Sequence, residues 1–236
     1  MSELEKLRAE PRVLRAEKEC AQMETVFLKK LAEIERRFIF LVESFWPKRH
    51  ILVCRKYMRY WYMKKIIYWQ IAGFAFTIII GTAFHFLFDL TNESIVAALV
   101  SPVNESIWEH IKLLFFPMLV YALFEYSFWG KEYARFWCIK LKGILTGMAL
   151  IPTLYYTYTG IIGESLDWFN IVIFFGVAGL VYLVETKMFL GNKTCRIPSE
   201  YAFVILCISG IVFFVFTFYP PEIPFFQDPV SKTYGF

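Results

Sequence analysis

The chain has 236 residues, of which 58% are hydrophobic, 20% aromatic and only 19% charged, and its formal net charge is +4. Soluble domains carry about 25% charged residues, and a soluble domain of this size keeps too large a surface in water to accommodate so many apolar side chains. The composition excludes a disordered chain and argues against an aqueous globular domain. It predicts an all-α polytopic membrane protein.

Residues 1–46 are expected to form a charged amphipathic helix on the cytosolic side. Its apolar side chains recur at alternating steps of four and three: Phe27, Leu31, Ile34, Phe38, Leu41 and Phe45. Such a stripe suits a short coiled coil or a helix docked on the membrane or on the protein's own bundle. It covers fewer than three heptads, so we favour the docked helix. We expect it to end at Pro47.

Residues 47–65 form a basic segment in which Lys and Arg alternate with Tyr and Trp and no acid occurs. Basic residues mixed with aromatics are typical of nucleic-acid binding as well as of membrane interfaces. The segment directly precedes a long apolar run. We therefore interpret it as an anchor on an anionic leaflet and expect no nucleic-acid partner.

Five apolar runs follow, each close to the roughly 20 residues that a membrane-spanning helix needs. They cover about 66–88, 113–129, 144–162, 168–184 and 201–219. Together they predict a five-helix transmembrane domain over 66–219. No secretory signal peptide is expected, because charged residues precede the first apolar run.

The distribution of Lys and Arg predicts the orientation of these spans. Fourteen basic residues fall in three segments on one side (48–65, 130–142 and 187–199), whereas the other side has only Lys112 and Lys232. The positive-inside rule then places the N-terminus inside and the C-terminus outside. Residues 220–236, rich in Pro and aromatics, are expected to fold back as a cap on the outer face, with Asp228 approaching the polar cluster described next.

Five cysteines occur: Cys20, Cys54, Cys138, Cys195 and Cys207. None forms a CxxC pair or has metal-ligand spacing. Because the predicted orientation keeps all five away from the oxidising face, we expect free thiols and no disulfide.

Polar side chains gather at the predicted outer ends of the first two spans. His85 and Asp89 are four residues apart, hence on one helix face. A helix predicted to start at Ser101–Pro102 would carry Glu105, Glu109 and His110 in its first turns. The short connection between the two helices makes them antiparallel neighbours, so the five side chains can meet. Tyr121 lies almost three turns below His110 on the same face.

This cluster predicts a catalytic site in which His85, Asp89 and His110 bind a divalent metal such as zinc. Imidazole and carboxylate suit such ions, and the remaining carboxylates Glu105 and Glu109 would serve as general bases for a metal-bound water. The spacing matches no metal-ligand motif. An alternative is a hydrogen-bonded cluster that fixes two helix ends, with the acids complementing a helix dipole. Glu93 can replace Glu105 in either interpretation.

Two further carboxylates, Glu125 and Glu185, lie near the predicted inner ends of the second and fourth spans. We expect them to reach the interface and pair with Lys131 and Lys187 there. On this interpretation neither takes part in the outer cluster.

The stretch Asn104-Glu-Ser-Ile-Trp-Glu-His, together with an ending that contains Pro220-Pro221, Asp228-Pro229 and Tyr234-Gly235, resembles a family of small, uncharacterised multi-span membrane proteins of bacteria, mostly Firmicutes. The resemblance covers roughly 66–236. It implies a location in the bacterial cytoplasmic membrane but no activity. The alkaline-ceramidase-like hydrolases do not fit, because the chain lacks a late HxxxH pair and has too few spans.

Two functions remain open from the sequence. One is a metal-assisted hydrolase or transferase that acts on a lipid or envelope substrate at the outer leaflet. The other is a non-enzymatic accessory, binding or transport subunit whose polar cluster is structural or holds a proton or ion. The bilayer is the expected environment in both, and a homo-oligomer is compatible with either.

Overall fold

The computed structural model describes residues 48–191 and 195–236. The chain divides into two compact units, residues 1–64 and residues 65–236, which are described separately. The amphipathic helix predicted over 1–46 lies outside the described residues. In the first unit, residues 48–64 are helical throughout and form the beginning of α3 (Lys48–Leu90).

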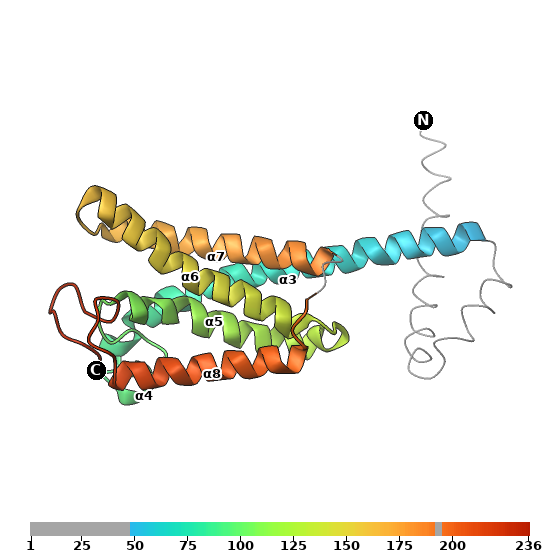
Figure 1. Ribbon diagram of the computed structural model, residues 1–236. Coiled ribbons are helices and arrows are strands. Elements are labelled where there is room, and N and C mark those ends of the chain that lie inside the picture. The colour runs from blue at the N-terminus through green and yellow to red at the C-terminus, as the bar shows by residue number, and fades with distance from the viewer. Residues whose placement is uncertain (1–47, 192–194) are drawn as a thin grey trace. The chain divides into compact units, whose positions relative to one another are not determined.

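The described part of the second unit is built from helices and loops, with a single isolated β-bridge between Gln227 and Tyr234. The elements after α3 are α4 (Ile95–Ala98), α5 (Ile107–Phe128), η1 (Gly130–Glu132), α6 (Phe136–Ile162), α7 (Asp167–Leu190) and α8 (Ser199–Phe218) (Figure 1). Five helices, namely α3 over Tyr60–Leu90 together with α5, α6, α7 and α8, are long and apolar enough to cross a membrane. The all-α class and the five predicted spans are confirmed.

Besides α3, which includes the basic segment, two helices begin more than one turn earlier than their apolar runs. We predicted about residue 113 for the second span and about 144 for the third, but α5 begins at Ile107 and α6 at Phe136. Both added turns contain charged side chains that are buried and paired inside the protein: Glu109 and Lys112 in α5, and Lys140 in α6. A count of apolar residues misses such turns.

The start of α5 also differs from the prediction. Ser106, and not Ser101, is the N-cap, and its hydroxyl accepts a hydrogen bond from the backbone N–H of Glu109. The Ser101 hydroxyl is buried and bonds back to α3 instead: it donates to the carbonyl of Phe84 and accepts from the N–H of Phe88 at 3.1 Å. Ser101 therefore ties the 91–106 connection to the end of α3.

The α3 helix packs against the bundle through one narrow stripe. Ile66, Gln70, Gly73, Thr77 and Gly81 are all buried and recur at steps of four or three. Glycine at two of these positions lets neighbours approach closely. A Cβ on Gly73 would lie 2.5 Å from the Tyr121 ring, and a Cβ on Gly81 would lie 2.6 Å from a backbone carbonyl of α5. Helix packing at this stripe fixes the rotation of α3.

The C-terminal segment packs on the end of the bundle where α3 ends and α5 begins. The Trp108 ring of α5 contacts both α8 and the tail, with centroids 4.6 Å from Phe213 and 4.9 Å from Phe226. The N–H of Phe236 donates to the carbonyl of Thr217 at 2.8 Å. Asp228 is not among the residues that meet at the two histidines, and its carboxylate accepts hydrogen bonds from its own turn, at Val230 and Ser231.

The cysteines correct the expectation of free thiols without a disulfide. Cys138, at the start of α6, and Cys195, shortly before α8, form a disulfide with their Cα atoms 6.3 Å apart. These residues are 57 positions apart in the chain, so no local spacing could indicate that the two helix ends meet. Cys207, in α8, is an exposed free cysteine.

Candidate metal centre

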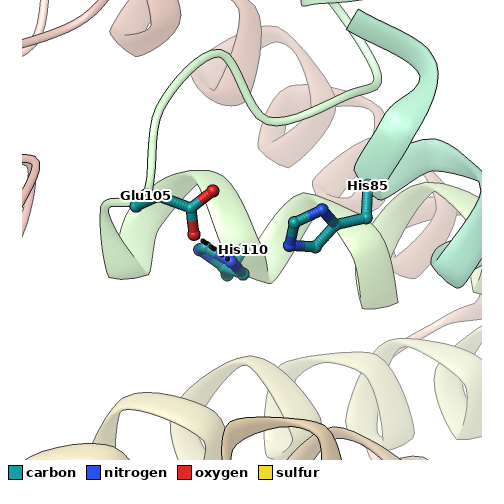
Figure 2. A group of neighbouring side chains, drawn as sticks. All are labelled: His85, Glu105 and His110. Carbon is teal, nitrogen blue, oxygen red and sulfur yellow. Dashed lines mark ion pairs between the residues drawn. The ribbon is translucent and has the colours of Figure 1, made fainter. Parts of the chain in front are cut away.

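Three side chains converge at the end of the bundle where α3 ends and α5 begins. His85 comes from α3, Glu105 from the connection before α5, and His110 from the first turns of α5 (Figure 2). One ligand atom from each lies within 4.8 Å of the other two. The imidazole centroids are 5.4 Å apart, and His110 Nε2 is 3.3 Å from Glu105 Oε2.

The buried stripe of α3 explains how His85 reaches this place. His85 follows Gly81 by four residues and therefore continues the same helix face one turn further on. The Gly81 backbone approaches the carbonyl of Leu113 on α5. Leu113 is three residues after His110. The close approach at Gly81 thus brings one turn of α3 and one turn of α5 together at the two histidines.

Local hydrogen bonding sets the protonation of His110. Its Nδ1 lies 2.9 Å from the carbonyl oxygen of Ser106, which can only accept. The Nδ1 atom must therefore carry a proton. Nε2 faces the Glu105 carboxylate, which also only accepts, so in the metal-free protein Nε2 carries a second proton that must leave before a metal binds there. A histidine whose Nδ1–H is held by a carbonyl presents Nε2 in a fixed direction, as metal-binding histidines do.

The cluster is open to solvent on one side. The side chain of Glu105 is 52% exposed and that of His110 26% exposed. The hydrogen bond from His110 lowers the pKa of Glu105, burial opposes this effect, and the two histidines add a favourable charge interaction. Glu105 is therefore ionised at neutral pH and available as an anionic ligand.

The separations are close to those of a tetrahedral site. Zinc bonds of about 2.0–2.1 Å place two tetrahedral ligand atoms roughly 3.3 Å apart. The His110–Glu105 pair already has this separation. All three ligand atoms lie within 4.8 Å, so side-chain adjustments of about an ångström would complete a three-ligand site. The donor set of two imidazoles and one carboxylate fits zinc or a related divalent ion.

Glu109 lies in the same turn but points into the protein. Its Oε2 contacts Lys112 Nζ at 2.5 Å and accepts from the N–H of Val103 at 3.1 Å, and both charged side chains are buried. Lys112 also donates to the carbonyl of Ala98. The pair therefore clamps the 91–106 connection. Lys112, which we counted among the cations of the outer side, is an internal cation.

Asp89 is exposed, one turn beyond His85, and is not among the three residues whose ligand atoms meet. Of the five predicted site residues, the structure brings together His85, Glu105 and His110. Glu109 is engaged by Lys112, and Glu93, the alternative to Glu105, lies in a turn with a positive φ of 58°.

A second charged cluster, which sequence reasoning missed, lies deep in the bundle near the opposite end of α5. Lys140 of α6 forms ion pairs with Glu125 of α5 and with Glu185 of α7, the latter at 2.7 Å, and all three side chains are at most 1% exposed. The prediction that these carboxylates pair with Lys131 and Lys187 at the interface is wrong. The sequence analysis had counted Lys140 with Lys142 in a basic loop, and no local feature of the sequence distinguishes the buried lysine from the exposed one.

Comparison with known proteins gives a family but no activity. No curated protein and no solved structure matches the chain. One family model matches residues 58–236, which include all five apolar helices and both charged clusters. The chain belongs to this family of unknown function, DUF6512.

Proposed function

We propose that the protein is an integral membrane protein in which His85, Glu105 and His110 bind one divalent transition metal. The observation that carries this proposal is the convergence of three ligand atoms within 4.8 Å, from three separate segments of the chain. Catalytic zinc sites have three protein ligands and leave a fourth position for water or substrate. A cluster that is partly exposed to solvent leaves room for that position.

The chemistry proposed for this site is metal-assisted hydrolysis or group transfer. A bound divalent ion lowers the pKa of its water to near neutrality and polarises a carbonyl or phosphoryl oxygen. Asp89, exposed and one helical turn from His85, is the candidate general base, because Glu109 is engaged by Lys112. A lipid or envelope substrate fits a site at the end of a membrane bundle, and the charge distribution favours the outer leaflet.

A specific observation favours the alternative of a non-enzymatic accessory or binding subunit. His110 has a partner at each ring nitrogen, Ser106 at Nδ1 and Glu105 at Nε2. A satisfied polar cluster of this kind also links two helix ends without any metal.

Metal content distinguishes the two functions. The full chain, purified without a polyhistidine tag after growth with zinc, should carry about one equivalent of a divalent transition metal by mass spectrometry. His85→Ala and His110→Ala should each lose it and still elute as folded protein, whereas Asp89→Asn and the exposed Glu164→Gln should retain it. A wild type that remains metal-free after incubation with zinc, manganese or ferrous iron would remove the enzyme proposal and leave the accessory one.

Activity follows as the second measurement. Metal-loaded protein should release headgroup or acyl product from phospholipid vesicles, and His110→Ala should not. Metal binding without turnover of phospholipid would retain the site and exclude this substrate class.

A further inference from the structure

The inner cluster has more negative than positive charge. Two carboxylates, Glu125 and Glu185, meet the single ammonium of Lys140, and none of the three side chains is more than 1% exposed. An uncompensated charge inside a membrane bundle is costly, and such sites acquire a counter-charge or become neutral. One more positive charge is therefore required.

The hydrogen bonds show which atoms lack a partner. Glu125 Oε1 accepts from Gln70 Nε2 at 3.1 Å, and Lys140 Nζ donates to Glu185 Oε2. Glu125 Oε2 forms an ion pair with Lys140 Nζ but has no hydrogen-bond partner among the described residues. Glu185 Oε1 is buried without a hydrogen-bond partner among the described residues. It faces the backbone of Gly143, where a Cβ would collide with it. Glycine at 143 thus leaves space for this oxygen.

A second buried group is directed into the same cluster. Gln70 of α3 is 2% exposed and donates to Glu125, while its own Oε1 has no hydrogen-bond partner within the described part of the chain. The cluster therefore has acceptor oxygens left over and too few hydrogens to satisfy them. Adding one proton balances the charge and supplies a hydrogen to one of these oxygens.

We propose that the cluster formed by Gln70, Glu125, Lys140 and Glu185 is a proton-binding site and that Glu185 Oε1 holds one proton at neutral pH. The proton comes from water and returns to it, so no other reactant is involved. A metal ion is a poor fit, because the Lys140 ammonium already occupies the point between the two carboxylates. This site shares no residue with the metal centre.

Other titratable groups around the cluster do not supply the missing charge. Tyr182 of α7 has its ring 5.4 Å from Lys140 Nζ and its hydroxyl bonded to Thr77 of α3. Tyr121 of α5 donates to the carbonyl of Trp69. The other groups around the Lys140 ammonium are the rings of Phe136 and Phe189, which stabilise a cation but carry no charge. None of these four rings supplies a positive charge, so we assign the compensation to the proton.

Infrared spectroscopy of the full-length protein in lipid nanodiscs tests this site. At pH 7 the wild type should show the C=O stretch of a protonated carboxylic acid, shifted in deuterium oxide. Glu185→Gln should remove the band, because the amide replaces the neutral acid. Glu125→Gln should also remove it, since Glu185 then pairs one-to-one with Lys140. Glu105→Gln, in the exposed outer cluster, is the matched control and should keep the band.

The outcomes are decisive even if one variant does not fold. Absence of a protonated-carboxyl band in the wild type at pH 7 would overturn the proposal without any variant. Persistence of the band in either folded variant, Glu125→Gln or Glu185→Gln, would assign the proton elsewhere and overturn it as well. Metal content does not enter this measurement, so its failure and that of the metal centre are distinguishable.

Discussion

Replacing Gly81 by alanine should weaken metal binding without touching any ligand. The added Cβ would lie 2.6 Å from the carbonyl oxygen of Leu113 and 2.7 Å from the Phe174 ring, whereas ordinary contact begins at 3.4 Å. The carbonyl belongs to helix backbone and cannot rotate away. The α3 helix must therefore move out by about 0.8 Å, and His85, one turn further along, moves with it.

The size of the effect follows from the cost of overpacking. Forcing one extra methyl group into a tight contact costs about 1–3 kcal/mol. If α3 relieves this strain by moving outward, metal binding has to draw it back, and the affinity should fall by about 5- to 150-fold. The ligand atoms are separated by up to 4.8 Å without metal, which is already more than the roughly 3.3 Å of a zinc site. Outward movement of α3 increases this separation further.

Competition with a chromophoric zinc chelator measures the affinity of each purified variant, and circular dichroism checks its folding. Gly176→Ala in α7 is the matched control, because its Cβ would meet no atom within 4 Å. This control should bind zinc within about twofold of the wild type. If Gly81→Ala is folded and also binds with wild-type affinity, the approach of α3 to α5 does not position His85, and the reasoning fails.

Two other predictions concern orientation and pH. A single cysteine at Glu164 should react with a membrane-impermeant thiol reagent on intact cells, and one at Lys131 should react only after permeabilisation, because basic loops favour the cytosolic side. The reverse labelling pattern would contradict this orientation. It would agree instead with a Cys138–Cys195 disulfide in an oxidising compartment. For the metal-free protein, the lowered pKa of Glu105 predicts a stabilisation that is present at neutral pH and lost as the pH falls below about 4. Its size is at most about 1 kcal/mol, because the carboxylate is half exposed, and identical melting profiles against pH for wild type and Glu105→Gln would contradict it.

The sequence predicted the helices well because their signal is local. Apolar runs of membrane length identified all five spans, and helical periodicity placed His85 at the correct end of α3. The proximity of His85 and His110 also followed, since a short connection between two long helices makes them antiparallel neighbours. These inferences required only the period and the rise of an α-helix.

The sequence analysis started this helix at Ser101–Pro102 and therefore placed Glu105 and Glu109 together on its first turns. Both Ser101 and Ser106 have the side chain of an N-cap, and only tertiary contacts distinguish them. With the helix starting after Ser106, Glu105 precedes the helix and turns to solvent, and the four-residue spacing no longer places it above Glu109. Ser101 is drawn away by the backbone of α3, a contact between distant segments.

The buried lysines were the other limit of sequence reasoning. Lys112 was counted on the outer side and Lys140 in a basic loop, although both side chains are buried and lie a full turn or more inside their helices. The carboxylate partner of Lys112 lies on the same helix, whereas the two partners of Lys140 lie on two other helices. Which surface a cation faces depends on how the helices rotate against each other. Composition alone cannot give that rotation.

Charge accounting explains why the two clusters should hold different ligands. The outer cluster has one carboxylate, two imidazoles and access to water, so a divalent cation finds neutral and anionic ligands with no competing ammonium. The inner cluster has an excess carboxylate but a lysine at its centre and no exposed edge, so only a proton fits. His110 and Glu125 are 15 residues apart on α5, or about 22 Å along the helix axis. At that separation, with water at one cluster and dry packing at the other, metal binding at one end need not perturb the proton at the other. The two assignments are therefore independent, and each stands on its own measurement.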